Sequence, residues 1–184
     1  MKSLTGTAVA GLLLAANLAC ADGLFSTDRF SLGLSAASAD IDVNDVGVDV
    51  HGKANGWRLF GAYELNERYS LEGGISTFDR PDDPTLATIP EVENESFDLF
   101  AVGRFPLSDR FDLIGKAGFV SWTTEVEESE ELEFSSSSTD LALGLGGEFD
   151  LNTRFSLRGE YLWTDASNSG AADTLSIAAI FHFQ

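Results

Sequence analysis

"LSDRFDLIG" at residues 107–115 has three near-copies in the same chain: "STDRFSLGL" from Ser26, "LNERYSLEG" from Leu65 and "LNTRFSLRG" from Leu151. Each copy has a polar pair, then Arg, then an aromatic residue, and a Leu two residues further on. The four Arg residues stand at positions 29, 68, 110 and 154, a period of about 40 residues. Repetition at this period indicates one structural unit, used four times.

Downstream of each Arg, apolar and polar residues alternate. In the third copy, Phe111, Leu113 and Phe119 fall on one face, whereas Asp112 and Lys116 fall on the other. A similar alternating run leads into each turn. This period of two is typical of β-strands. Eight such runs can be counted, each of about ten residues, which is the length that a tilted strand needs to cross a bilayer.

The connections between these runs are unequal. The segments 66–68, 107–110 and 151–153 are short and contain Asn, Ser and Asp, which favour turns because their side chains bond nearby backbone groups. Longer polar segments lie near 39–54, 79–95, 123–138 and 164–173. The sequence therefore predicts an all-β, antiparallel, up-and-down barrel of eight strands, with short turns at one end and long loops at the other.

Alternation alone fits two kinds of barrel, because a soluble barrel buries its apolar face and a membrane barrel turns that face to lipid. The polar face favours the membrane barrel, because it carries charges of both signs, which can pair in a narrow interior. We predict a structural charge cluster there, formed by Arg58, Glu64, Glu72, Arg104, Lys116, Glu148, Arg158 and Glu160.

The aromatic residues of the apolar face gather beside the short turns, as an interfacial girdle does in a membrane barrel. This predicted girdle comprises Phe30, Tyr63, Tyr69, Phe105, Phe111, Phe149, Phe155, Phe181 and Phe183. Short turns on one side and long loops on the other are also typical of outer-membrane barrels. We therefore expect periplasmic turns and extracellular loops.

Three phrases resemble the OmpA/OmpX-type family of eight-stranded outer-membrane barrels: "VGRFPLSDRFDLIGKAGF" (102–119), "LGGEFDLNTRFSLRGEY" (145–161) and "IAAIFHF" (177–183). The resemblance covers 22–184 and implies an interior salt-bridge cluster, to which Glu64, Glu72, Arg104, Lys116, Glu148 and Arg158 correspond by position. Two features depart from the family pattern. Gln184 follows the usual terminal Phe, and no peptidoglycan-binding domain follows the last run, so we expect no cell-wall anchor of that kind.

The first 21 residues read as a signal peptide. Lys2 precedes a short apolar run at 8–16, and "ACA" at 19–21 fits a cleavage site near Ala21. We therefore expect a leader at 1–21, a barrel domain at 22–184 and residence in the cell outer membrane. The alternative is that Cys20, the only cysteine, carries a lipid, although the residues before it fit the lipidation motif poorly.

The net charge is −19, which disfavours nucleic acid as a partner, because phosphate contacts need Lys and Arg. Acid is concentrated in the long segments: Asp40, Asp42, Asp45, Asp49, Asp79, Asp82, Asp83, Glu91, Glu93, Glu95, Glu125, Glu127, Glu128, Glu130, Glu131 and Glu133. We expect outer-membrane lipid and lipopolysaccharide as partners, bridged weakly by divalent cations, or a surface that is only hydrated. We expect the C-terminal strand to engage the barrel-assembly machinery.

No pattern predicts a catalytic, cofactor or metal site. The two histidines are His51 and His182, and neither belongs to a His-x-Ser motif. The segment 40–49 has the wrong residue, Asp45, where a calcium loop needs Gly, and the segment 125–133 reads as a solvated loop. The sequence predicts a non-enzymatic barrel with a structural or surface-interaction role and a charge-plugged interior. The alternatives are a narrow channel and a membrane-embedded lipid-modifying enzyme.

Overall fold

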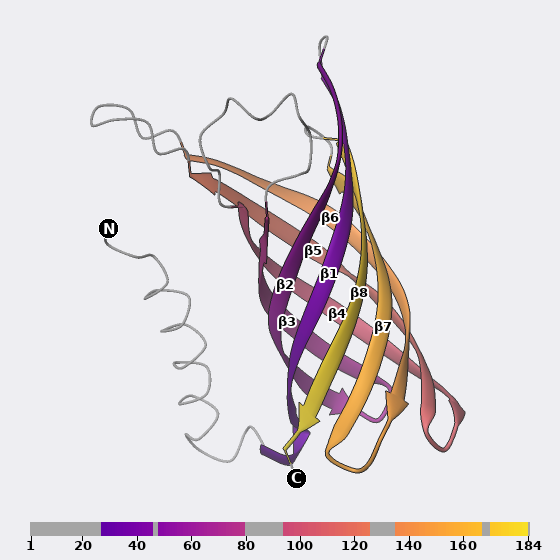
Figure 1. Cartoon of the computed structure of the whole chain (residues 1–184). Coiled ribbons are helices and arrows are strands. Elements are labelled where there is room, and N and C mark those ends of the chain that lie inside the picture. Colours follow the sequence, from indigo (N-terminus) through magenta and orange to yellow (C-terminus); the bar gives the residue numbers. More distant parts are fainter. Residues whose placement is uncertain (1–26, 46–47, 80–93, 126–134, 167–169, 184) are drawn as a thin grey trace.

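The computed structural model describes residues 27–45, 48–79, 94–125, 135–166 and 170–183. They form a short 3-10 helix, η1 (Thr27–Arg29), and the strands β1 (Phe30–Asp45), β2 (Val48–Asn66), β3 (Tyr69–Phe78), β4 (Asn94–Ser108), β5 (Phe111–Glu125), β6 (Ser135–Asp150), β7 (Phe155–Ala166) and β8 (Gly170–His182). Each strand pairs antiparallel with the next, and β8 pairs with β1 to close the barrel (Figure 1). The predicted fold class is confirmed. Among the described residues, no helix is long and apolar enough to cross a membrane. The expected leader at 1–21 lies outside them.

Three tight turns join β2 to β3, β4 to β5 and β6 to β7, where the sequence predicted them. In the first turn, the side-chain oxygen of Asn66 accepts hydrogen bonds from the backbone N–H groups of Arg68, at 2.9 Å, and Tyr69, at 3.0 Å. Asn152 repeats this arrangement in the third turn, at 2.8 and 3.1 Å. The C-terminus lies at this same end of the barrel (Figure 1). The two Asn side chains therefore stabilise their turns by accepting hydrogen bonds from nearby backbone N–H groups, as turn residues of this type do.

Seven of the eight strands are longer than the predicted length of about ten residues, and several of them extend into segments that were predicted as loops. The strands range from 10 residues in β3 to 19 in β2. Most of the segment 39–54 belongs to the β1–β2 ladder, which extends to the pair Asp45–Val48. The segments 123–138 and 164–173 are also partly strand, while 80–93 lies outside the described residues. Backbone groups make the ladder bonds, so polar side chains lengthen a hairpin beyond the lipid without ending it.

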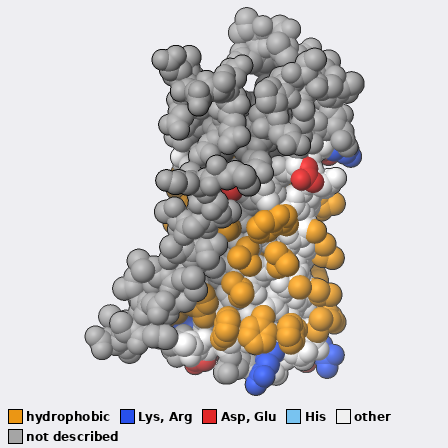
Figure 2. Space-filling model, turned by 60° about the vertical axis from the view of Figure 1, so that its left-hand side comes forward, with side chains coloured by type: hydrophobic (Ala, Val, Ile, Leu, Met, Phe, Trp, Pro, Cys, Tyr) orange, Lys and Arg blue, Asp and Glu red, His pale blue; other side chains and the backbone are white. Residues whose placement is uncertain are grey.

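The apolar face of the wall points outward, as the membrane barrel requires. Leu145 on β6 is 61 % exposed and Leu175 on β8 is 65 % exposed, whereas alternate residues of the same strands are buried. Figure 2 shows hydrophobic side chains spread over the described part of the wall, with Lys and Arg side chains beneath them. A soluble barrel needs the opposite arrangement, because water would face these side chains. The soluble alternative is therefore wrong.

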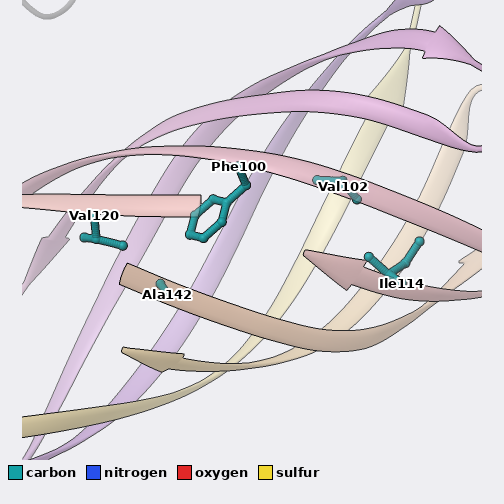
Figure 3. Close-up of a cluster of buried hydrophobic side chains, with 5 residues drawn as sticks. All are labelled: Phe100, Val102, Ile114, Val120 and Ala142. Atoms are coloured by element: carbon teal, nitrogen blue, oxygen red, sulfur yellow. The ribbon is translucent and has the colours of Figure 1, made fainter. Parts of the chain in front are cut away.

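The interior is not purely polar. One buried apolar cluster consists of Phe100, Val102, Ile114, Val120 and Ala142, and Figure 3 shows how these side chains lie. Phe60, Ala178 and Ile180 form a second cluster. The aromatic rings of Phe60 and Phe100 are each 1 % exposed and come from the central parts of β2 and β4. These rings supply the packing against which the interior charges lie.

Candidate functional site

A network of charged side chains occupies the barrel interior, and Glu72 on β3 stands at its centre. The Glu72 side chain is 0 % exposed. Its Oε2 accepts a hydrogen bond from Nη1 of Arg158 at 2.6 Å, and its Oε1 lies 2.9 Å from Nη1 of Arg58. Nζ of Lys116 lies 3.7 Å from the same Oε1. Three cations surround one buried carboxylate, so each of them needs a further anion.

Arg58 on β2 receives that anion from β4. Its Nε and Nη2 donate to the two carboxylate oxygens of Asp98, at 2.7 and 2.5 Å, which is the two-point geometry that suits a planar guanidinium. The guanidinium carbon also lies 4.5 Å from the ring centre of Phe60 and 5.8 Å from that of Phe100. Gly74 leaves the necessary space, because a Cβ there would lie 2.9 Å from Nε of Arg58. Ring faces attract a cation, so packing and charge hold the same side chain.

Arg158 and Lys116 each have a further carboxylate partner as well. Nε of Arg158 donates to Oε2 of Glu148 at 2.8 Å across the β6–β7 pair. Nζ of Lys116 donates to Oε1 of Glu160 at 2.5 Å. The Arg158 side chain is only 4 % exposed. Removing a charge from water costs free energy unless the charge is paired with good geometry. The contacts of Arg158 and Lys116 provide that pairing.

Arg104 on β4 extends the network toward the short turns. Its Nη2 donates to Oε1 of Glu148 at 2.9 Å, and its Nη1 and Nε lie 3.4 Å from Glu64 and Asp112, respectively. The Arg104 side chain is 22 % exposed, so water reaches this part of the interior more easily than the centre. Glu148 therefore links the dry centre to a wetter short-turn end.

All eight residues of the predicted charge cluster lie in this network, and two further residues that were not predicted also belong to it. Asp98 pairs with Arg58 and Asp112 lies beside Arg104. Both stand on the polar face of their alternating runs, so the same period of two would have assigned them to the interior. The rings of Phe60 and Phe100 were also missed as neighbours of the cations, because aromatic residues are expected on the lipid side.

The nine residues of the predicted girdle lie on the outward side of the strands, or just beyond β8, next to the short turns. Ring centres are 5.2 Å apart between Phe155 and Phe181 and 5.0 Å apart between Phe181 and Phe183. The structure also exposes a second outward set nearer the long connections: Trp57, Phe97, Phe119, Tyr161 and Trp163. Two aromatic bands are what a barrel with two membrane–water interfaces needs.

His182 makes a contact that no sequence motif announced. Its Nε2 lies 2.9 Å from Oγ of Ser156, across the β7–β8 pair, and this Oγ donates to Oδ1 of Asp150 at 2.6 Å. In a catalytic relay the carboxylate bonds the histidine, and the histidine takes the proton of the serine. Here the serine hydroxyl donates its hydrogen bond to the carboxylate rather than to the histidine, and Ser156 is 1 % exposed. The arrangement therefore differs from that of a serine hydrolase.

One protein-family model and several solved structures are similar to this chain. A family model described as "Outer membrane protein beta-barrel domain" matches residues 5–183. Among solved structures, Ail of Yersinia pestis, in complex with the heparin analogue sucrose octasulfate, is 18 % identical with a TM-score of 0.57 and covers 84 % of this chain and 99 % of its own. Neisserial surface protein A is 13 % identical, with a TM-score of 0.68 and coverage of 84 % and 97 %.

The N-terminal barrel domain of Pseudomonas aeruginosa OprF is 11 % identical, with a TM-score of 0.53 and coverage of 82 % and 97 %. No curated protein sequence matches this chain. At these identities the solved structures share the fold, while the family model extends over nearly the whole chain. The family resides in the outer membrane, which agrees with the outward apolar wall. The chain therefore belongs to the outer-membrane β-barrel domain family.

Proposed function

We propose that this chain is a non-enzymatic outer-membrane barrel with a structural or surface-interaction role, whose interior is closed by the charged network. The observation that carries this proposal is the buried centre of the network, where Arg58, Lys116 and Arg158 converge from three strands on Glu72, which stands on a fourth. An eight-stranded barrel is just wide enough for side chains to fill. The cavity beside Arg58, Lys116 and Glu160 has a volume of about 40 Å³, room for little more than one water at about 30 Å³ each.

Conductance across planar bilayers tests the plug directly. Refolded protein should give no discrete current steps beyond those of a lipid and detergent blank, because paired side chains fill the cross-section. Folding of the same sample is checked by its faster migration on gels before heating. Stable, reproducible current steps from folded protein would instead establish the narrow channel. Release of fatty acid or acyl transfer in lipid vesicles would establish the membrane enzyme.

For the surface role, the support is the polarity of the chain along the barrel axis. The three polar segments at 39–54, 79–95 and 123–138 hold 16 of the 30 Asp and Glu residues, whereas Arg29, Arg68, Arg110 and Arg154 stand at the short-turn end. We propose that the short turns face the periplasm and the long connections face outward. A sulfated ligand such as that of the Ail complex would be repelled by such acidic segments. Deleting each long connection in turn, followed by pull-down from intact cells, tests which of them binds a partner.

Lipopolysaccharide is the partner that we propose for the acidic end, through divalent cations. Carboxylates beside lipid phosphates repel one another unless Ca²⁺ or Mg²⁺ bridges them, and oxygen-rich segments suit these ions at about 10⁻⁴–10⁻³ M. Thermal unfolding in bilayers that contain lipopolysaccharide should shift upward with millimolar Ca²⁺ relative to chelator, at matched ionic strength. Equal midpoints would leave only a hydrated surface.

We propose that the C-terminal strand engages the barrel-assembly machinery. Phe181 on the outward side of β8 packs against Phe183, which lies just beyond the end of the strand. Phe183→Ala should therefore lower the amount of folded barrel in the outer membrane of cells without a comparable loss in refolding from urea. Equal membrane yield for this variant and the wild-type chain would contradict the assignment.

A further inference from the structure

At the short-turn end of the interior, the described ion pairs contain more carboxylates than cations. Among the described residues, Glu64, Asp112 and Glu148 contact Arg104 there. Asp150 lies beside them on β6 and accepts a bond only from the neutral hydroxyl of Ser156 in the contacts described above. Arg158, the other cation in contact with Glu148, is shared with Glu72 in the centre. An interior region of this kind attracts a further cation.

His182 on β8 converges on two of these carboxylates. One ligand atom each from Glu148, Asp150 and His182 lies within 4.8 Å of the others, with Glu148 buried and the other two half-buried. The Ser156 hydroxyl has one proton, which it donates to Asp150. Its oxygen therefore accepts from Nε2–H of a neutral His182, at 2.9 Å. In this tautomer the lone pair of the His182 ring is on Nδ1.

We propose that Glu148, Asp150 and His182 form a binding site for a divalent transition-metal ion, with Zn²⁺ as the reference ion, entered from the short-turn end. One imidazole and two carboxylates are a ligand set that suits Zn²⁺ or Co²⁺, whereas Ca²⁺ and Mg²⁺ prefer oxygen ligands alone. Three protein ligands leave a position for water. The site is separate from the acidic long connections and from lipopolysaccharide, which lie at the opposite end.

The contacts around the three ligands fit this role. Each carboxylate oxygen of Glu148 has two lone pairs, so Glu148 can bind a metal while Arg104 and Arg158 continue to donate to it. Ser156 orients His182 and Asp150 at the same time, in the way that outer-shell hydrogen bonds orient metal ligands. The sequence did not show this site, because β7 and β8 separate Asp150 from His182 along the chain and strand pairing brings them together.

Metal binding to the refolded, untagged full chain in detergent without lipopolysaccharide tests the site. Co²⁺ should give a visible absorption band that saturates at one equivalent of metal per chain. The band should disappear when Zn²⁺ displaces the Co²⁺. His182→Gln and Asp150→Asn should each weaken Zn²⁺ binding at least about tenfold, as loss of a ligand or its support does. The chain has only one other histidine, His51. His51→Gln is therefore the matched control and should bind as the wild-type chain does.

A second measurement needs no variant. In protein labelled with ¹⁵N-histidine, Zn²⁺ should shift the ring resonances of one histidine at stoichiometric amounts, and that histidine should be the one missing from spectra of His182→Gln or retained in those of His51→Gln. Wild-type chain that binds no Zn²⁺ at 1 mM metal would overturn the proposal. Equal binding by folded wild-type, His182→Gln and Asp150→Asn chains would overturn it as well.

Discussion

The inner and outer faces of the barrel wall are made from alternate residues of the same strands, and each meets a different solvent. On β7, Ser156 and Arg158 are almost completely buried inside, whereas Phe155 and Leu157 are exposed outside. The inner side chains are linked to one another by ion pairs across several strands. The outer ones contact lipid, and each contributes through its own burial there. A substitution inside should therefore disturb several partners, while a substitution outside should act through its depth in the membrane.

Removing one cation from the inner network should have the largest effect. Arg158→Ala leaves Glu72 and Glu148 without their shorter contacts, and loss of one partner of a buried pair costs about 3–5 kcal/mol. Arg154→Ala removes the same side chain from the exposed turn of that hairpin and should change the free energy of unfolding by less than about 0.5 kcal/mol. Urea unfolding in lipid vesicles measures both values.

The same comparison can be graded within the network. Arg104 is 22 % exposed, against 4 % for Arg158, so Arg104→Ala should cost less than Arg158→Ala, because water can solvate the carboxylates that it leaves. Equal unfolding midpoints for Arg158→Ala, Arg104→Ala and the wild-type chain would show that the network is hydrated throughout and contributes little to stability.

The sequence predicted which side chains face inward, because a period of two assigns a face to each residue of a strand. The sequence did not predict which of the inward charged residues form ion pairs with one another. Arg158 and Glu72 are 86 residues apart, and their contact depends on the stagger of all eight strands around the barrel, which no local pattern encodes. For the same reason, the contact of His182 with Ser156 and Asp150 was not foreseen.

Loop boundaries were the other part that the sequence misplaced. A loop was predicted at 39–54 because the segment is polar and acidic, yet the β1–β2 ladder continues to the pair Asp45–Val48. The short turns, by contrast, were placed correctly, since Asn66 and Asn152 determine their geometry locally. Features that depend on neighbouring residues were predictable, whereas features that depend on strand pairing beyond the lipid were not.

A charge on the outer face should have the next largest effect. Leu145 on β6 is 61 % exposed and stands four residues from Phe149 of the predicted girdle, toward the long connections. Leu145→Arg places a charge in the lipid core, at about 2–4 kcal/mol near the bilayer midplane. Leu151→Arg makes the same change in the exposed turn and should be nearly neutral. Equal unfolding free energies for the two variants would contradict a lipid-facing wall.

Adding one methyl group should change the free energy of unfolding differently on the two faces of the wall. A Cβ at Gly33 on β1 would overlap the ring of Phe60 inside the barrel, whereas at Gly115 on β5, which faces lipid, it would meet nothing within 4 Å. Gly33→Ala should destabilise by about 1–3 kcal/mol, the usual cost of overpacking. Gly115→Ala should be neutral or stabilise by up to about 1 kcal/mol, because Ala loses less backbone entropy than Gly in a strand. Destabilisation of both variants to the same extent would refute this difference between the faces.

The smallest effect is expected where neither face is involved, at the turn that joins β2 to β3. Asn66→Ala removes the oxygen that accepts from the N–H groups of Arg68 and Tyr69, but water can replace both bonds because the turn is exposed. The cost should therefore be at the lower end of what such hydrogen bonds contribute, about 0.5–1.5 kcal/mol. Asn66→Asp keeps an oxygen at the same position, so it should recover most of the loss in urea unfolding. If Asn66→Asp and Asn66→Ala were equally destabilised, the side-chain acceptor would not be what stabilises this turn.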